Sequence, residues 1–161
     1  MNLSVSDGAF AGAVDAGQLY QNSGAAAGVN INIVQEPADG YWSNVWLKKP
    51  WCACYWSGRA TEDWMFSTAY ESGVPWNDTG WENERFQSLL MQGRAELDPG
   101  LRGEIYREMQ AICRDEGGTV VPMYQNYVDA KSNRVEHSGQ TGNLWMLAVS
   151  YTHLTLPTTP V

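Results

Sequence analysis

The stretch "LSVSDGAFAGAVDAGQLYQNSGAAAGVNINIV" (Leu3–Val34) decides the fold class, because two strand-like runs flank one helix-like run. Leu3–Ser6 has the pattern of a short strand, and Asp7 can cap a helix over roughly Ala9–Ala27. Gly28 then ends that helix as a C-cap glycine. The run "VNINIV" alternates apolar and polar residues, which predicts a strand with one buried face. Strand, helix and strand in this order predict a parallel pair and an α/β lobe.

The remaining sequence predicts helices and strands that would extend this lobe. Asp98 is placed to cap a helix whose first position is Pro99, and that helix would pair with the one before it as a hairpin supporting the sheet. In chain order the predicted elements are a helix Ala38–Lys48, a buried strand "WCACYW" (51–56), a helix "ATEDWMFSTAY" (60–70), a loop Ser72–Trp81, helices Glu82–Leu97 and Pro99–Glu116, and strands "TVVPMY" (119–124) and "NYVDAKSNRV" (126–135).

Composition excludes several classes of protein. The 161 residues suffice for one domain with its own core, and 43% of them are hydrophobic. The formal net charge of −8 argues against a nucleic-acid partner, because phosphate binding needs clustered lysine and arginine. No apolar run approaches the roughly 18 residues of a spanning helix, and no export signal is visible after Met1. We expect no direct membrane span in this chain.

Aromatic residues are unusually dense in the middle of the chain. Such a density is typical of a core or of a cavity lined with flat ring faces. Seven of the eight tryptophans fall within forty residues: Trp42, Trp46, Trp51, Trp56, Trp64, Trp76 and Trp81.

The segment "WCACYWSGRATEDW" (51–64) concentrates the candidate chemistry. Cys52 and Cys54 would share one face of a strand, but the other ligands of a zinc site are missing, so we expect buried strand residues and no metal. Glu62 and Asp63 are adjacent and point in different directions on a helix, which is typical of helix-start charges. No nucleophile motif or phosphate loop is present. We expect neither an enzyme nor a cofactor.

A ligand is expected instead at the turn after "WCACYW", because ligands of α/β lobes bind where strands end and helices begin. Trp56 offers a flat apolar wall, and Arg59 a planar cation for a carboxylate. Arg59 has an equally weighted alternative role, in which it stacks on Trp56 or caps a neighbouring carbonyl. The predicted ligand-binding residues are Tyr55, Trp56, Ser57, Arg59 and Asp63.

The last thirteen residues, "VSYTHLTLPTTPV" (149–161), differ abruptly from the rest by their threonine, leucine and proline content and lack of charge. A disordered tail or a final strand would explain them. We prefer a third interpretation, because "VSYTHLTLPT" resembles one translated frame of a sequencing adapter. We therefore expect 149–161 to be a non-native tail and exclude it from the fold.

Three ordered stretches resemble the C-terminal third of peptide-type (family 5) solute-binding proteins of ABC transporters. They are "AGVNINIVQEPADGYWSNVW", "YWSGRATEDWMF" and the long stretch from "WENERFQ" to "KSNRV". The helical hairpin from Leu89 to Tyr124 is the most specific part. The resemblance implies part of one lobe of a two-lobed periplasmic-binding-protein-like fold (type II, cluster C), which closes on its ligand by a hinge. It implies a partial C-terminal lobe over 1–135 and a segment returning to the missing N-terminal lobe over 136–148.

The resemblance also implies a function. An extracytoplasmic, or periplasmic, receptor of this family captures a peptide or other small molecule and delivers it to the transmembrane subunits of an ABC permease. In oligopeptide-binding members, a tryptophan matching Trp56 is followed three residues later by an aspartate that holds the ligand's amino group, whereas this chain has Arg59. We therefore expect either an anionic ligand group at Arg59 or an amine at Asp63. The alternative function is a self-contained aromatic-rich module that binds carbohydrate.

Overall fold

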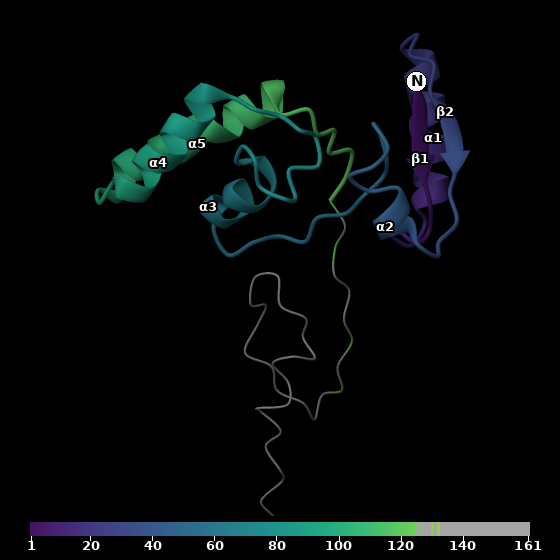
Figure 1. Cartoon of the computed structure of the whole chain (residues 1–161), viewed down its shortest axis with the longest axis horizontal. Coiled ribbons are helices and arrows are strands. Elements are labelled where there is room, and N and C mark those ends of the chain that lie inside the picture. Colours follow the sequence, from purple (N-terminus) through teal and green to yellow (C-terminus); the bar gives the residue numbers. More distant parts are fainter. Residues whose placement is uncertain (125, 127–129, 131, 133–161) are drawn as a thin grey trace, which may run out of the picture. The chain divides into compact units, whose positions relative to one another are not determined.

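The computed structural model describes residues 1–124, 126, 130 and 132. The chain divides into two compact units, Met1–Ser57 and Gly58–Val161. Figure 1 shows the helices and strands of both units along the sequence. The presence of both helices and strands agrees with the α/β class that the sequence predicts. Among the described residues, every helix is too short or too polar to serve as a membrane span.

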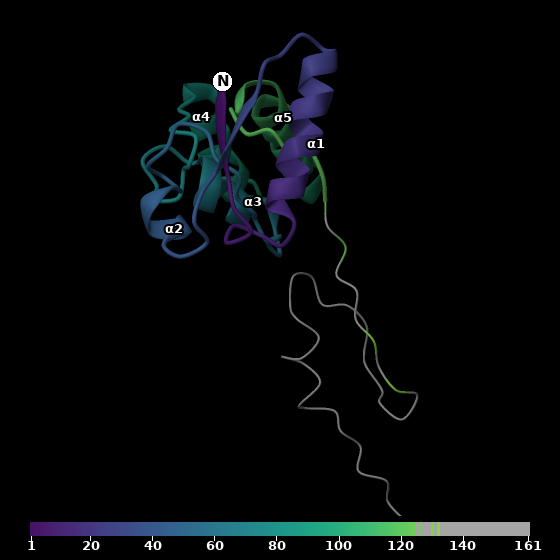
Figure 2. The same ribbon diagram turned by 90° about the vertical axis from the view of Figure 1, so that its right-hand side faces the viewer.

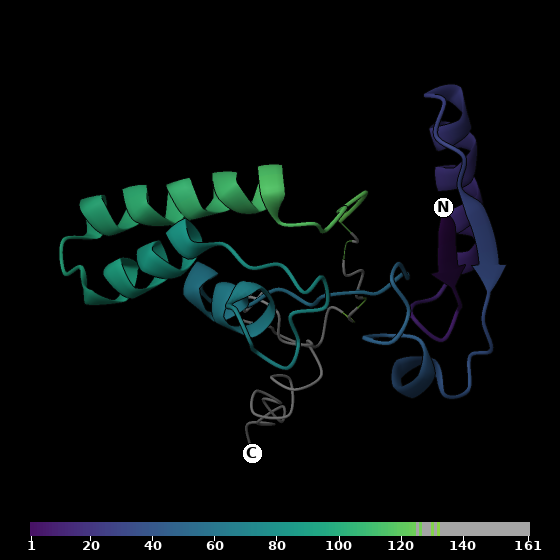
Figure 3. The same ribbon diagram turned by 45° about the horizontal axis from the view of Figure 1, so that its top comes forward.

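A strand, a helix and a second strand form the frame of the first unit. β1 (Asn2–Val5) and β2 (Asn32–Gln35) pair in parallel, with Leu3 opposite Ile33. The crossover is α1 (Ala13–Ala26), which runs alongside both strands in Figures 1 and 3 and is seen from a second direction in Figure 2. The parallel pair predicted from the opening sequence is confirmed.

The two ends of α1 differ in how well the sequence predicts them. The helix begins at Ala13, four residues later than predicted, because residues before it form turns in which the Ala9 amide donates to the Ser6 carbonyl at 2.9 Å. Asp7 still reaches the helix start, where its carboxylate accepts from the Val14 amide at 3.4 Å. Gly28 lies just past the helix with φ 78°, which confirms the predicted C-cap glycine.

The prediction of a buried strand over "WCACYW" is wrong. Only one residue of it, Cys52, forms an isolated parallel bridge, to Ser4 of β1. Ser4 donates its amide to the Trp51 carbonyl at 3.1 Å and accepts from the Ala53 amide at 2.8 Å. The segment therefore touches β1 over a few residues and then leaves it. Both cysteines are half-buried and lie outside any strand, so their predicted role as buried strand residues is wrong as well.

The helix predicted over Ala38–Lys48 shortens to the single turn α2 (Tyr41–Asn44). Leu47 interrupts the helical path, because its φ of 60° lies in the left-handed region. Tyr41 and Val45 are four residues apart and both buried, so the helical spacing still turns one apolar face inward. Two small clusters form the core of this unit: Ala9, Ala13, Tyr41 and Val45 in one, and Leu3, Val5 and Ile31 in the other.

The regular elements described in the second unit are helices. α3 (Glu62–Met65) continues into a π-helical turn, η1 (Phe66–Tyr70), and a loop leads to the hairpin of α4 (Glu84–Ala95) and α5 (Pro99–Glu116). The two hairpin helices lie side by side in Figures 1 and 3. Asp98 accepts from the amides of Gly100 and Leu101 at 2.7 and 2.9 Å. The predicted hairpin and its cap are thus confirmed.

Aromatic and aliphatic side chains from α4, α5 and η1 form the core of this unit. Phe86 is fully buried and meets the rings of Phe66 and Trp81 at centroid distances of 5.3 and 5.1 Å. On the hairpin surface, Arg85 donates two hydrogen bonds to Glu108, at 2.8 and 3.0 Å. The buried cluster consists of Phe66, Phe86, Leu89, Leu90 and Met109.

The prediction of a strand over residues 119–124 is also wrong, because the structure assigns no strand there. Val120, Val121, Met123 and Tyr124 are all exposed, so this apolar stretch has no packed face in the described chain. The predicted strand over 126–135 lies mostly outside the described residues. The predicted return segment 136–148 and the predicted tail 149–161 lie entirely outside them.

Candidate ligand-binding site

Five aromatic rings of the first unit form one continuous chain of edge-to-face contacts. Trp42 on α2 occupies the middle, with ring centroids 5.8 Å from Tyr41, 5.7 Å from Trp46 and 5.6 Å from Tyr55. Trp46 in turn contacts Trp56 at 6.4 Å. Edge-to-face pairs of this kind place the positive ring edge on the negative face of the neighbour. The arrangement is therefore favourable.

Hydrogen bonds hold the first two rings of this chain in place. The buried Tyr41 hydroxyl lies 2.7 Å from the Ala53 carbonyl and 3.2 Å from the Ser4 carbonyl. These contacts connect α2 both to β1, through Ser4, and to the segment 51–56, through Ala53. Burial raises the pKa of this hydroxyl, so it remains a donor at any physiological pH. The Trp42 indole N–H donates to the Gly8 carbonyl at 3.0 Å. These bonds fix the orientation of Trp42 although its ring is partly exposed.

Three of the predicted ligand-binding residues belong to this unit. Tyr55 is exposed and packs its ring on Trp42, whereas Trp56 is half-buried against Trp46. Ser57 is half-buried and is the last residue of the unit. The two aromatic residues of the predicted site therefore contact Trp42 of α2 and Trp46 just after it. Arg59 and Asp63 fall in the second unit.

Arg59 stacks on a ring and caps a neighbouring carbonyl, the two contacts that the sequence analysis gave as its alternative role. Its guanidinium lies over the ring of Trp64, 5.5 Å from the centroid, and donates to the Gly58 carbonyl at 3.2 Å. The stacking partner is therefore Trp64 and the capped carbonyl is that of Gly58. Binding of an anionic ligand group by Arg59 stays a prediction.

Asp63 is engaged by Arg94 of α4. The Arg94 Nε lies 2.9 Å from Oδ1 and 3.0 Å from Oδ2 of Asp63, and Nη2 lies 3.5 Å from Glu71. The Ser67 hydroxyl donates to the Asp63 carbonyl at 2.6 Å and accepts from Arg94. The hydrogen bonds that Arg94 donates to the Asp63 carboxylate raise the pKa of the Arg94 guanidinium. Asp63 thus connects α3 to α4.

Replacing Asp63 with asparagine should therefore destabilise the second unit by about 1 kcal/mol, because a charged hydrogen bond is lost at a partly screened position. The measurement is urea denaturation followed by circular dichroism at pH 7. Asp115→Asn is the matched control, since the Arg114–Asp115 pair has side-chain exposures of 75% and 59% against 36% and 25% for Arg94 and Asp63. Equal midpoints for Asp63→Asn and the unmodified chain would contradict a structural role for the pair.

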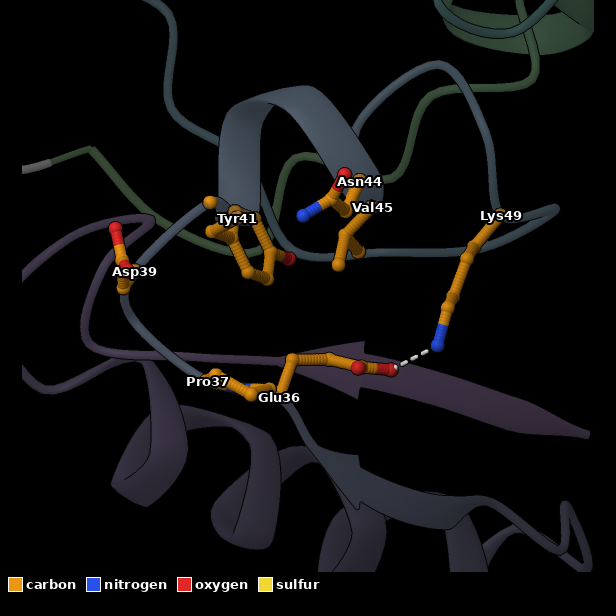
Figure 4. Close-up of a pocket in the computed structure, with 8 residues that line it drawn as sticks. Glu36, Pro37, Asp39, Tyr41, Asn44, Val45 and Lys49 are labelled. Carbon is orange, nitrogen blue, oxygen red and sulfur yellow. Dashed lines mark hydrogen bonds and ion pairs between the residues drawn. The ribbon is translucent and has the colours of Figure 1, made fainter.

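A small pocket lies just beyond the carboxyl end of β2, and Figure 4 shows its side chains. Its volume is about 190 Å³, enough for one side chain or a few waters. Glu36 accepts from the Ser4 hydroxyl at 2.8 Å and pairs with Lys49, which lowers the pKa of the Glu36 carboxyl. The charges at this end of the pocket therefore satisfy each other. Its lining residues are Glu36, Pro37, Asp39, Gly40, Tyr41, Asn44, Val45 and Lys49.

Metal-ligating side chains are not gathered in the part of the chain that the structure describes. No group of three or more histidine, cysteine, aspartate or glutamate side chains there could hold a metal ion. Cys52, Cys54 and Cys113 form no disulfide. The described residues thus offer an aromatic surface and two arginines in local contacts as their candidate binding chemistry.

The ligand-binding residues predicted from the sequence include Trp56 and Arg59 but neither Trp42 nor Trp46, whose rings contact Tyr55 and Trp56. Trp42 and Trp46 are four residues apart, and this helical spacing was the available signal, although α2 ends at Asn44 and Trp46 follows it. Arg94 lies 31 residues from Asp63, and no local pattern could connect them. The pocket at Glu36 follows the general rule that α/β sheets bind ligands at the carboxyl ends of their strands.

Comparison with known proteins gives one partial similarity. No protein-family model matches the chain. Over 48 residues the chain is 44% identical to the oligopeptide-binding protein OppA of Bacillus subtilis (strain 168). The matched segment is 30% of this chain and 9% of that protein, so the chain spans less than a tenth of the relative's length. The similarity supports a local relationship to a peptide-binding protein.

Proposed function

We propose that these residues belong to the solute-binding component of an ABC importer, which captures a peptide or related solute outside the cytoplasm and delivers it to the permease. The observation that carries the proposal is the 44% identity over 48 residues to a protein named for oligopeptide binding. In this proposal the chain contributes part of one lobe of a larger two-lobed receptor and has no enzymatic activity.

The structure supports this proposal through its aromatic surface. Trp42 is 39% exposed and Tyr55 is 59% exposed, although both lie in a chain of packed rings. Large rings held in fixed positions at a surface are typical of ligand-binding sites and interfaces. In the proposed receptor, the ligand and the second lobe would cover these rings, which explains their exposure in this chain.

Within this proposal, Arg59 binds a carboxylate or another anionic group of the ligand. Its contacts with Trp64 and the Gly58 carbonyl orient the guanidinium, whose planar fork suits a carboxylate. The alternative, an ammonium group bound by Asp63, has less support because Arg94 already supplies a cation to that carboxylate. We therefore favour recognition of the peptide's carboxyl end.

Calorimetry on the product of the complete gene that contains these residues tests the proposal. We expect binding of unmodified pentapeptides, weaker binding of their C-terminal amides and no binding of oligosaccharides. Arg59→Ala should lower the affinity for the unmodified peptide by about 10- to 100-fold, the worth of a charged hydrogen bond. Arg85→Ala is the matched control, because Arg85 pairs with Glu108 on the hairpin surface.

Two results would contradict parts of this proposal. Binding of oligosaccharides without binding of any peptide would favour the self-contained carbohydrate-binding module. Unchanged affinity of Arg59→Ala for the unmodified peptide, with equal binding of the amide, would remove Arg59 from the site and leave peptide binding intact.

A further inference from the structure

We propose that the rings of Trp42 and Tyr55 form a right-angled corner that selects ligands carrying an aromatic side chain. The inference rests on the proposed function, because it names the class of peptide that the receptor prefers. The two ring planes make an angle of 83°, with centroids 5.6 Å apart.

Both residues of the corner are exposed to solvent. Trp42 is 39% exposed and Tyr55 is 59% exposed, the latter well above the other residues of the aromatic chain. An aromatic guest can stack offset on one ring while its edge meets the face of the other, which are the two favoured geometries of ring pairs. Two rings at 83° therefore provide both geometries to one guest at once.

The corner is also preorganised. The indole N–H of Trp42 is bonded to the Gly8 carbonyl at 3.0 Å, and the Trp42 ring is packed by Tyr41 on α2 and by Trp46. The ring therefore does not have to be ordered when a ligand arrives, which removes part of the entropic cost of binding. The fixed ring is the physical basis for selectivity.

Magnitudes favour an aromatic guest over a cationic one. An exposed cation–π contact strengthens binding by about two- to fivefold, and the cation must shed its hydration. An aromatic pair strengthens binding by about two- to twelvefold beyond the gain from burying the ring area itself. The same corner should therefore prefer phenylalanine to lysine at the matching ligand position.

The test compares peptides that differ at one position, using calorimetry on the product of the complete gene. Pentapeptides of alanine carry phenylalanine, cyclohexylalanine, lysine or alanine at each internal position in turn. At one position we expect phenylalanine to bind about tenfold more tightly than alanine, with cyclohexylalanine between them because it buries a similar area without ring quadrupole. Lysine should gain less than phenylalanine.

Variants locate the preference. Tyr55→Leu keeps an apolar side chain and should reduce the ratio of the phenylalanine-peptide affinity to the alanine-peptide affinity to at most threefold. Trp42→Ala should reduce this ratio as well. If Trp42→Ala folds poorly, Tyr55→Leu still tests the proposal. Trp76→Ala is the control, because Trp76 is 49% exposed but belongs to the second unit.

The possible outcomes separate this inference from the proposed function. Equal affinities for all the pentapeptides, or tightest binding of the lysine peptide, would overturn the aromatic corner and leave peptide binding standing. A phenylalanine preference that survives Tyr55→Leu and Trp42→Ala would also overturn it. The absence of binding to every peptide would reject the proposed function and this inference together.

Discussion

Replacing Phe86 with alanine is expected to destabilise the second unit by about 3–5 kcal/mol, because it removes a fully buried ring and leaves a cavity. Phe86 is 0% exposed. Its ring contacts Phe66, Trp81 and Tyr70 at centroid distances of 5.3, 5.1 and 6.5 Å. These partners come from η1 and from the loop before α4, so the loss should affect the whole unit.

Thermal and urea unfolding, followed by circular dichroism at 222 nm, measure this loss of stability. The helices of the second unit dominate the signal at that wavelength. Met91→Ala is the matched control, because Met91 is on the same helix and 62% exposed. It should change the stability by less than about 0.5 kcal/mol. Equal losses for the two variants would contradict the described packing of α4.

Cys113 is expected to react with Ellman's reagent at pH 8 about 30- to 1,000-fold more slowly in the folded chain than in the unfolded chain. Burial raises the pKa of its thiol from 9.0 to about 12. The folded protein then holds about a thousandfold less thiolate at pH 8, and the greater nucleophilicity of a high-pKa thiolate offsets only part of that loss.

The measurement needs a background in which Cys52 and Cys54 are both serine, so that Cys113 is the reacting thiol. Rates with and without 6 M guanidinium chloride are compared. The raised pKa of Cys113 also makes the stability of the fold depend on pH. The unfolded chain releases this proton first, so the free energy of unfolding falls as pH rises from about 9 to about 12. Similar rates in both states would contradict the burial of Cys113.

The elements that local sequence could predict are those whose stabilising contacts are close in the chain. The hairpin has its cap, Asp98, next to its first proline, and its apolar residues repeat at helical spacing. The alternation in "VNINIV" and the helix-ending Gly28 predict the parallel pair. In these segments the period of the apolar residues is itself the signal.

The wrong predictions share a cause. "WCACYW" and "TVVPMY" have strong strand propensity, but a strand exists only where another backbone offers its ladder of hydrogen bonds. Ser4 provides that partner to Cys52 alone. Residues 119–124 have no such partner among the described residues, and their apolar side chains stay exposed. Propensity describes a suitable residue type, and pairing decides the structure.

The candidate site shows the same division. From the sequence alone came its class of chemistry, with flat aromatic rings, one arginine at the end of the aromatic run and no catalytic cluster. Spacing also predicted one helix face for Trp42 and Trp46, whereas α2 ends at Asn44, before Trp46. Only the tertiary structure decided which groups are available, because it brought Arg94 to Asp63 across 31 residues and set Tyr55 against Trp42 at 83°. Side-chain types and periods are local properties of a chain, whereas pairing of charges and angles between rings depend on where distant segments pack.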